Sequence, residues 1–402
     1  MKLFLTILCL NLILHVNSGF LQAQSVDQSA SINFFGTNFS YPENPRLQVA
    51  VNRPLDEASI KLFFDNINQE DYRPLINSLL SYKDRYKLDD WLFYQLIRRT
   101  AQELSAKAVD YERYTLYKWF MLVKCGYNVQ LAFANDKLLF YVQSNENIYE
   151  IPLFEEHGKQ FVCLNIHDFG KIDFQKEPLR KVDINVPGAL SAFSYRINRI
   201  PDFNTADYTE KRLSFYYKDK QVSYEVKENP NIVKLFANYP SVDFESYFNI
   251  PMCKETYTSL IPVLKRKLKG KSQYAGIDYL MKFTRHAFMY ETDQENFGVE
   301  KRLSPQQTLM QQYSDCDDRV GLLYYLIKEI YNLPMIVMVY PSHVTLGVEL
   351  KKPHGIPIFY KGAQYSICEP TPQQFELPIG GLSPELKDVA YQIQYEYDPT
   401  KK

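Results

Sequence analysis

Three fragments of the chain recur in the same order almost half a chain length further on. The matching pairs are Tyr72–Ile76 with Tyr257–Ile261 at an offset of 185 residues, Trp91–Ala101 with Ile277–Ala287 at 186, and Arg113–Val129 with Arg319–Met335 at 206. Both sets lead from helical spacing into strand-like spacing, so the repeat predicts two copies of one fold. The longer last offset leaves a polar insert of 20 residues around Glu291–Met310 in the second copy.

The first copy changes from helical to strand spacing at Lys137. Its apolar residues recur at helical spacing: Leu75, Leu79 and Leu80, then Leu92, Leu96 and Ile97. Predicted strands follow over 138–142, 148–153 and 161–164, with turn residues between them. Short strands then continue and end in a hairpin-like pair, which predicts a small β-rich module over 166–230.

The second copy repeats this change from helices to strands. We expect helices over 257–268 and 277–288, a third helix that starts near Cys316, and strands over 335–340, 344–350, 356–360 and 365–368. Helices followed by a run of antiparallel strands predict an α+β fold. The expected organisation is an α+β unit at 45–165, the β-rich module at 166–230, and a second α+β unit at 231–402.

The N-terminus has the pattern of a secretory signal. Lys2 precedes the apolar stretch Leu3–Leu14, which is too short for the ~20 residues of a membrane-spanning helix. Leu21–Ala23 offers a small-residue cleavage site, so we expect a signal peptide over 1–23, followed by a polar linker over 24–44. No later segment is long and apolar enough to cross a membrane. These features predict an exported protein of the periplasm or extracellular space.

Five cysteines remain after the predicted signal: Cys125, Cys163, Cys253, Cys316 and Cys368. Their spacing fits neither a zinc site nor a dense disulfide framework, and an odd number in an exported chain leaves at least one thiol unpaired. Most cysteines of this kind are small buried hydrophobes. A reactive thiol therefore needs evidence from its surroundings.

Cys316 has such surroundings. Apolar residues follow it at helical spacing: Val320, Leu323, Ile327 and Ile330. Ser314 and Asp317 have the form of a capping box, which puts the cysteine in the first turn of a helix. Free N–H groups and the positive dipole end there favour a thiolate and can hold an oxyanion. The carboxylates of Asp315, Asp317 and Asp318 oppose the thiolate, and the sequence leaves this balance open.

A histidine and a carboxylate follow at similar intervals. His343 opens a predicted strand 27 residues after Cys316, and Glu369 ends another strand 26 residues later, in a Glu-Pro-Thr turn. A thiol becomes a strong nucleophile when a nearby imidazole takes its proton. A carboxylate fixes the tautomer of that imidazole and stabilises its charged form.

In this order and setting the residues resemble the transglutaminase-like superfamily, a relative of the papain-type cysteine proteases. That family places its cysteine at a helix start, its histidine at a strand start and an Asp at a later strand end. The resemblance covers about Tyr257–Thr371, is weaker over Tyr72–Leu164, and is absent from the β-rich module. It implies two papain-like α+β units, with Cys316 as nucleophile, His343 as base and Glu369 as orienting carboxylate.

The chain departs from the family pattern near the histidine. Val344–Leu346 follow where the family usually has an aromatic residue, and Glu369 replaces the more usual Asp. The tryptophans of the chain both lie in the first copy: Trp91 and Trp119. The candidates for oxyanion or substrate contacts precede the cysteine: Gln311, Gln312 and Tyr313. The competing interpretation of these polar residues is an ordinary surface.

The first copy is predicted to be inactive. At the offset of 206 residues, Asp110 corresponds to Cys316 and Lys137 to His343, so neither a thiol nor an imidazole is present. Cys125 and Cys163 are then predicted to be core residues. Asp168 follows His167, but no third ligand is near in sequence, and we expect no metal ion and no cofactor.

Two functions remain open at this level. The first is an exported thiol hydrolase that cleaves amide or peptide bonds through an acyl-enzyme, with a peptide or protein as substrate. The alternative is a catalytically inactive relative that binds peptide or glycan in the cell envelope. Lysine and arginine number 46 against 47 acidic residues, a formal net charge of -1, so long-range attraction to nucleic acid is not expected.

Overall fold

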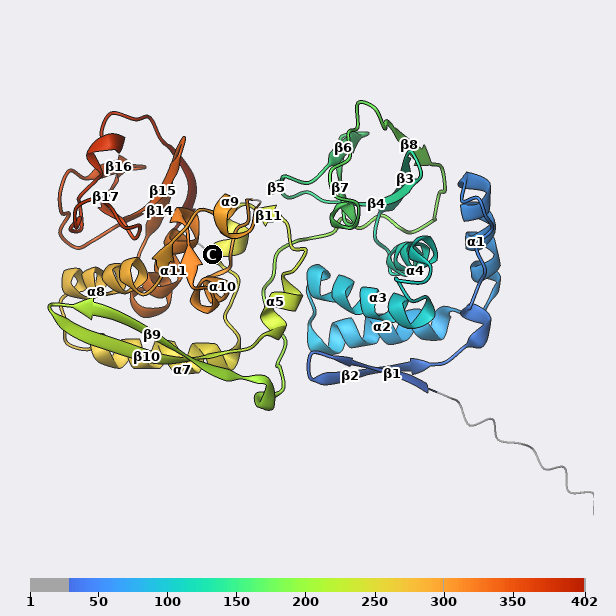
Figure 1. Ribbon diagram of the computed structural model, residues 1–402, viewed down its shortest axis with the longest axis horizontal. Coiled ribbons are helices and arrows are strands. Elements are labelled where there is room, and N and C mark those ends of the chain that lie inside the picture. Colours follow the sequence, from blue (N-terminus) through green and yellow to red (C-terminus); the bar gives the residue numbers. More distant parts are fainter. Residues whose placement is uncertain (1–28, 299, 401–402) are drawn as a thin grey trace, which may run out of the picture.

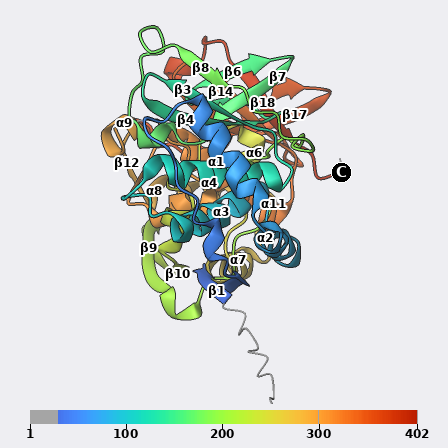
Figure 2. The same ribbon diagram turned by 90° about the vertical axis from the view of Figure 1, so that its right-hand side faces the viewer.

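The computed structural model describes residues 29–298 and 300–400. Two α+β units lie side by side in it, and each has a β-hairpin at one end, helices in the middle and a curled five-stranded sheet at the other end (Figure 1). The same layers are visible after a quarter turn (Figure 2). The predicted α+β class is confirmed. The predicted signal peptide lies outside the described residues.

The first unit is built around a sheet in the order β6-β7-β4-β3-β8, with every neighbouring pair antiparallel. Its elements are β1 (Ser29–Phe34), β2 (Thr37–Pro42), α1 (Glu57–Gln69), α2 (Arg73–Tyr86), α3 (Asp90–Leu104), α4 (Tyr111–Lys124), β3 (Val129–Ala134), β4 (Lys137–Gln143), β5 (Ile148–Tyr149), β6 (Leu153–Glu156), β7 (Lys159–Cys163) and β8 (Leu179–Val182).

The second unit has a sheet in the order β16-β17-β15-β14-β18, again antiparallel throughout. Its hairpin and early elements are β9 (Thr209–Tyr217), β10 (Lys220–Glu228), α5 (Asn231–Leu235), β11 (Ser241–Val242), α6 (Phe244–Phe248), α7 (Lys254–Leu268) and α8 (Gln273–His286). The later elements are β12 (Met289–Tyr290), α9 (Asp293–Asn296), α10 (Pro305–Met310), β13 (Tyr313–Ser314), α11 (Cys316–Tyr331), β14 (Met335–Tyr340), β15 (His343–Val348), β16 (Ile358–Tyr360), β17 (Ala363–Cys368) and β18 (Gln392–Tyr397).

The two sheets have the same strand order and the same connections along the chain. A long helix, α4 or α11, leads directly into the central hairpin of each sheet, β3-β4 or β14-β15. The initial hairpins also correspond, because β1 and β2 pack on α3 and α2, as β9 and β10 pack on α8 and α7. This common arrangement is what two copies of one fold require.

The predicted linker over 24–44 is wrong for its described part. Residues 29–42 form the hairpin β1-β2, in register from Ser29 opposite Pro42 to Phe34 opposite Thr37. The alternating burial of Ile32 and Phe34 shows the strand period. The prediction failed because each strand has six residues, which is too few for alternation to stand out from the polar residues around it.

The predicted β-rich module over 166–230 is also wrong. Its first strand, β8, is the edge strand of the first sheet and pairs with β3. Its last two strands form the hairpin that covers α7 and α8 of the second unit. The short strands of this region therefore belong to both units, and local spacing could not show to which unit each belongs.

The helix α11 carries the candidate nucleophile and is buried along most of its length. Residues 317–327 are all buried, since the helix lies against β15 on one side and α7, α8 and α10 on others. A helix enclosed in this way is apolar on nearly every face, and α11 has this character after the charged residues 317–319 near its start. Gly321 allows close packing of α6, because a Cβ atom there would lie 2.8 Å from the ring of Phe248.

Candidate active site

The first turn of α11 places Cys316 as predicted, with one correction to the cap. The N-cap residue is Asp315, whose carboxylate accepts a hydrogen bond from the Asp318 N–H, and not Ser314. Cys316 is therefore the first helical residue, with a backbone N–H that no helical carbonyl can reach. All five cysteines named above are free thiols, and of these only Cys125 and Cys316 are partly exposed.

His343 and Glu369 form a hydrogen-bonded pair. His343 begins β15 after a two-residue turn, opposite Tyr340, and β17 runs beside β15 with Cys368 opposite Leu346. Glu369 directly follows β17, and its Oε2 lies 2.8 Å from His343 Nε2. This contact leaves Nδ1 as the nitrogen that can accept a proton from a thiol.

The Glu369 carboxylate is held in place on both sides. It is fully buried, and its second oxygen, Oε1, accepts a hydrogen bond from the Thr371 N–H at 2.8 Å. The backbone of the Glu-Pro-Thr turn therefore donates a hydrogen bond to the side chain of its own glutamate. Both carboxylate oxygens have hydrogen-bond partners. The carboxylate is therefore fixed in position, although glutamate has one more methylene group than the aspartate that is usual in the family.

The sulfur of Cys316 lies beside the start of β15. The backbone N–H of Val344, the residue after His343, lies close enough to the sulfur to lower the pKa of the thiol, and the Glu369 carboxylate acts on the same thiol in the opposite direction. Cys316, at a helix start, therefore lies near the strand start and the strand end that carry the bonded pair His343 and Glu369. These are the three positions that the sequence pattern indicated.

Burial raises the pKa of the Cys316 thiol well above its ordinary value, and the carboxylates of Asp317 and Asp315 add to this effect. The Val344 N–H acts in the opposite direction but is the weaker influence. Burial and the acidic surroundings therefore act against the helix start at this thiol. A base such as His343 is needed to remove its proton during attack.

The pKa values of two neighbouring carboxylic acids are also shifted. Burial and the nearby Asp317 raise the pKa of Asp315 and of Asp318. Asp317 accepts a hydrogen bond from the Tyr247 hydroxyl at 3.3 Å and lies 3.6 Å from the Arg302 guanidinium. Asp317 is therefore the carboxylate that most directly opposes a thiolate at Cys316.

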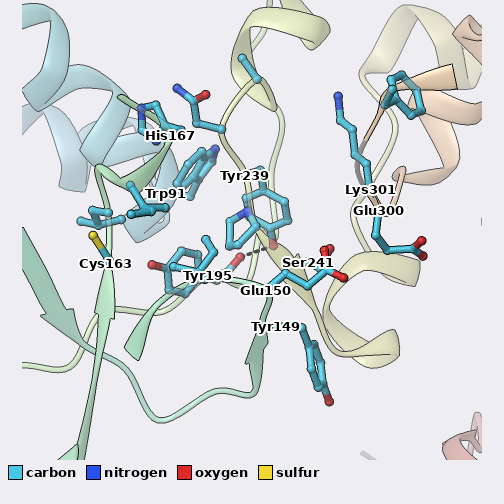
Figure 3. Close-up of a pocket in the computed structure, with 17 residues that line it drawn as sticks. Trp91, Tyr149, Glu150, Cys163, His167, Tyr195, Tyr239, Ser241, Glu300 and Lys301 are labelled. Carbon is cyan, nitrogen blue, oxygen red and sulfur yellow. Dashed lines mark hydrogen bonds between the residues drawn. The ribbon is translucent and has the colours of Figure 1, made fainter. Parts of the chain in front are cut away.

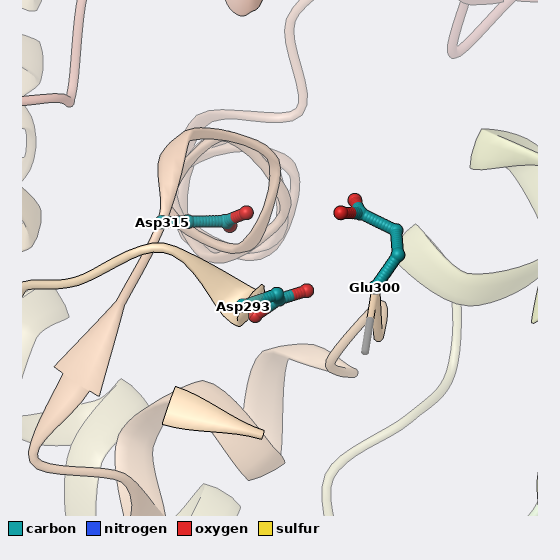
Figure 4. A group of neighbouring side chains, drawn as sticks. All are labelled: Asp293, Glu300 and Asp315. Carbon is teal, nitrogen blue, oxygen red and sulfur yellow. The ribbon is translucent and has the colours of Figure 1, made fainter. Parts of the chain in front are cut away.

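A group of acidic side chains beside α11 has the ligand type that hard cations prefer. Oxygens of Asp293, Glu300 and Asp315 lie within 4.8 Å of one another, and their carboxylates face a common space (Figure 4). Asp293 already accepts a hydrogen bond from the Lys301 N–H at 2.7 Å, and Asp315 caps the helix. Their protein partners explain the placement of two of the three carboxylates, and we assign no metal to this group.

Two buried arginines, which the sequence did not single out, fix the backbone around the triad. Arg319 donates hydrogen bonds to four carbonyl groups: those of Ser314, Thr284, Arg285 and Phe288. These bonds tie the segment before Cys316 to the end of α8. Arg285 in turn donates to the Glu369 carbonyl. Sequence patterns could not identify them, because arginine is usually a surface residue.

The predicted oxyanion candidates lie in the segment that leads to α11. Gln311 caps the end of α10 and Tyr313 starts β13, which pairs with β12. Among the described residues, no hydrogen bond joins the side chains of Gln311, Gln312 or Tyr313 to the triad. A nearer aromatic residue is Tyr290, whose pKa is raised by burial and by the adjacent Cys316. Tyr290 lies just before the insert and outside the repeated fragments, so the sequence comparison did not single it out.

The corresponding place in the first unit has different side chains. Asp110 is the N-cap of α4, as Asp315 is of α11, so Tyr111 rather than Asp110 occupies the position of Cys316. Lys137 opens β4 as His343 opens β15. Asn165, just beyond β7, donates to the Tyr111 hydroxyl at 2.9 Å. The unit lacks a thiol and an imidazole at these positions.

A cleft of about 570 Å³ lies between the two units (Figure 3). Aromatic side chains of Trp91, Tyr195 and Tyr239 line it on one side, and Glu300 and Lys301 from the insert lie opposite. The Glu300 carboxylate reaches the acidic group next to Cys316. A cleft of this size is within the range of small-molecule and peptide sites.

Comparison with protein-family models, curated proteins and solved structures finds no match to this chain. No helix among residues 29–298 and 300–400 combines the length and apolar character needed to cross a bilayer.

Proposed function

We propose that the second unit is a thiol hydrolase that cleaves amide or peptide bonds through a covalent thioester. The observation that supports this most directly is the His343–Glu369 pair at 2.8 Å, with the Cys316 sulfur beside the N–H of the residue next to that histidine. The resemblance to the transglutaminase-like superfamily agrees with the same three residues.

The first half of the reaction forms the thioester. His343 Nδ1 takes the thiol proton while Cys316 Sγ attacks the carbonyl carbon of the amide, and Glu369 stabilises the resulting imidazolium. The carbonyl electron pair moves to oxygen, where the free N–H groups at the start of α11 stabilise it. The C–N bond then breaks, and the leaving amine receives the proton from His343.

The second half releases the acid. Water loses a proton to His343 and attacks the thioester carbon, and the C–S bond breaks. Cys316 regains its proton from the imidazolium, and the enzyme is restored. An amine in place of water would give a new amide, so hydrolysis and acyl transfer differ only in the second nucleophile.

Alkylation of the thiols by iodoacetamide tests the proposal. Cys125 is the internal control, because it too is partly exposed and burial raises its pKa, as it does for Cys316. Faster reaction at Cys316 would then come from His343 acting as its base. We expect Cys316 to react at least 10-fold faster than Cys125 at pH 7.5, and His343→Ala to remove that advantage. Equal, slow labelling of both residues in the wild-type protein would contradict the proposal and favour an inactive binding protein.

A further inference from the structure

A second hollow, also of about 570 Å³, lies on the side of the first unit between β1, α3, α4 and α5. We call it the basic groove. Its charged and amide lining consists of Gln95, Arg98, Arg99, Glu103, Lys107 and Lys234 together with Asn33 and Gln102. None of these residues belongs to the proposed triad or to the cleft between the units.

The charge of the basic groove is positive. Four cationic side chains line it, against one carboxylate, that of Glu103. Lys107 is also paired with Asp168 behind the lining. Two positive charges remain after both acids are counted, in a chain whose formal net charge is -1. This excess is local and favours an anionic ligand.

Gln95 provides a hydrogen-bond donor that no protein group uses. The residue is only 7% exposed, and its Nε2 has no partner. Arg98 donates to Gln95 Oε1 at 3.0 Å, which establishes which end of the amide is the oxygen. A buried donor without an acceptor is unfavourable, so a ligand oxygen at this position would be stabilising.

Arg99 is held rigidly at the same groove. Its Nη1 donates to the Asn33 carbonyl at 2.6 Å, and its guanidinium lies 4.1 Å from the centre of the Phe35 ring. Stacking and a backbone contact fix the planar group before any ligand arrives. A preorganised guanidinium loses little conformational entropy when it binds an oxyanion.

We propose that the basic groove of the first unit binds an oxyanion, a phosphate or carboxylate group of a ligand, through Gln95 Nε2 and the surrounding cations. This site goes beyond the proposed hydrolase activity and does not depend on it. It gives the unit that lacks the triad a binding role of its own.

Calorimetric titration of the full-length protein tests the site with two probes, inorganic phosphate and succinate, at equal ionic strength in chloride buffer. We expect saturable binding of at least one probe. Gln95→Glu should weaken it at least 10-fold, because a carboxylate replaces the donor while the acceptor for Arg98 is kept. Lys234→Gln should weaken it several-fold, and this side chain is exposed, so the fold is not disturbed.

The matched control is Gln221→Glu, which adds the same charge at an exposed position of β10 and should leave binding within twofold. Binding of phosphate alone or of succinate alone identifies the oxyanion, and binding of both supports the shared chemistry. Absence of saturable binding, or equal weakening by both glutamate substitutions, would overturn the proposal. Cys316→Ala should bind as the wild type does, which separates this site from the proposed hydrolase.

Discussion

The two units have one architecture and different chemistry at the same place. In the second unit, a helix start, a strand start and a strand end carry Cys316, His343 and Glu369. In the first unit, Tyr111 and Lys137 occupy the places of Cys316 and His343, and Asn165 lies close to the place of Glu369. The comparison shows that the scaffold brings three positions together and that the side chains decide whether they can react.

Burial also shifts the pKa of titratable groups in both units. Beside α11 of the second unit, burial raises the pKa of Asp293 to about 7. In the first unit, burial lowers the pKa of Lys118 well below its usual value and that of His167 to about 4. The shifts of Asp293 and His167 have opposite signs, so their contributions to the pH dependence of stability should be opposite.

The largest effect is expected from removal of the sulfur. Cys316→Ala should lower hydrolysis of peptide amides at least 1,000-fold, because no other nucleophile is present at that position. Cys163→Ala, in the first unit, should leave the rate within twofold. Mass spectrometry of products from a peptide-amide mixture would measure both, and equal loss in the two variants would contradict the assignment of chemistry to the second unit.

The buried groups predict opposite pH slopes. The Asp293 pKa is raised in the folded state, so the folded protein binds an extra proton and its stability falls as pH rises from about 4 to 7. The His167 pKa is lowered, so the unfolded chain binds the extra proton and stability rises from about pH 4 to 6.5. The full shifts set upper limits of about 4 kcal/mol for Asp293 and about 3 kcal/mol for His167, and solvent screening lowers the second value further because His167 is exposed.

Urea unfolding of variants at several pH values would separate the two contributions. Asp293→Asn should remove the loss of stability as the pH rises from about 4 to 7. His167→Gln should remove the gain of stability as the pH rises from about 4 to 6.5. If each substitution left the pH profile of the free energy of unfolding unchanged, the contributions assigned to Asp293 and His167 would be wrong.

Glu369 and Asn165 should differ in what they stabilise: Glu369 the charged form of His343, and Asn165 the fold of the first unit. Glu369→Gln keeps the shape but removes the charge that orients His343, and we expect a loss of about 100-fold in rate with little change in stability. Asn165→Ala removes bonds to the Phe140 N–H and the Leu138 carbonyl, so we expect about 3 kcal/mol less stability and unchanged activity. Kinetics and thermal denaturation on both variants would distinguish these outcomes.

The smallest expected change concerns the carboxylate that opposes the thiolate. Asp317→Asn should lower the pKa of the Cys316 thiol and increase its alkylation rate at pH 7 about threefold. The rate for Cys125, in the other unit, should not change. A slower reaction at Cys316 in this variant would show that Asp317 supports the thiolate instead of opposing it.

The sequence predicted the long elements and the places of the triad, because helical and strand periods are clear where many residues repeat. Residues 335–340 were predicted as a strand and form β14. The hairpin β1-β2 and the edge strand β8 were missed or misassigned, since they are short and depend on distant partners. Arg319 and the unused donor of Gln95 were also missed, because their roles arise from burial among residues far apart in sequence.

The connection between the units limits how the molecule can be divided. Ile148–Tyr149 of the first unit pair with Ser241–Val242 at the entrance to the second, and the indole of Trp91 donates to the Leu235 carbonyl. The predicted boundary at residue 231 would separate these partners and strip β9-β10 from α7 and α8. Excision at that point would therefore expose apolar helix surface, whereas cleavage products that retain residues from 209 onward would keep this cover.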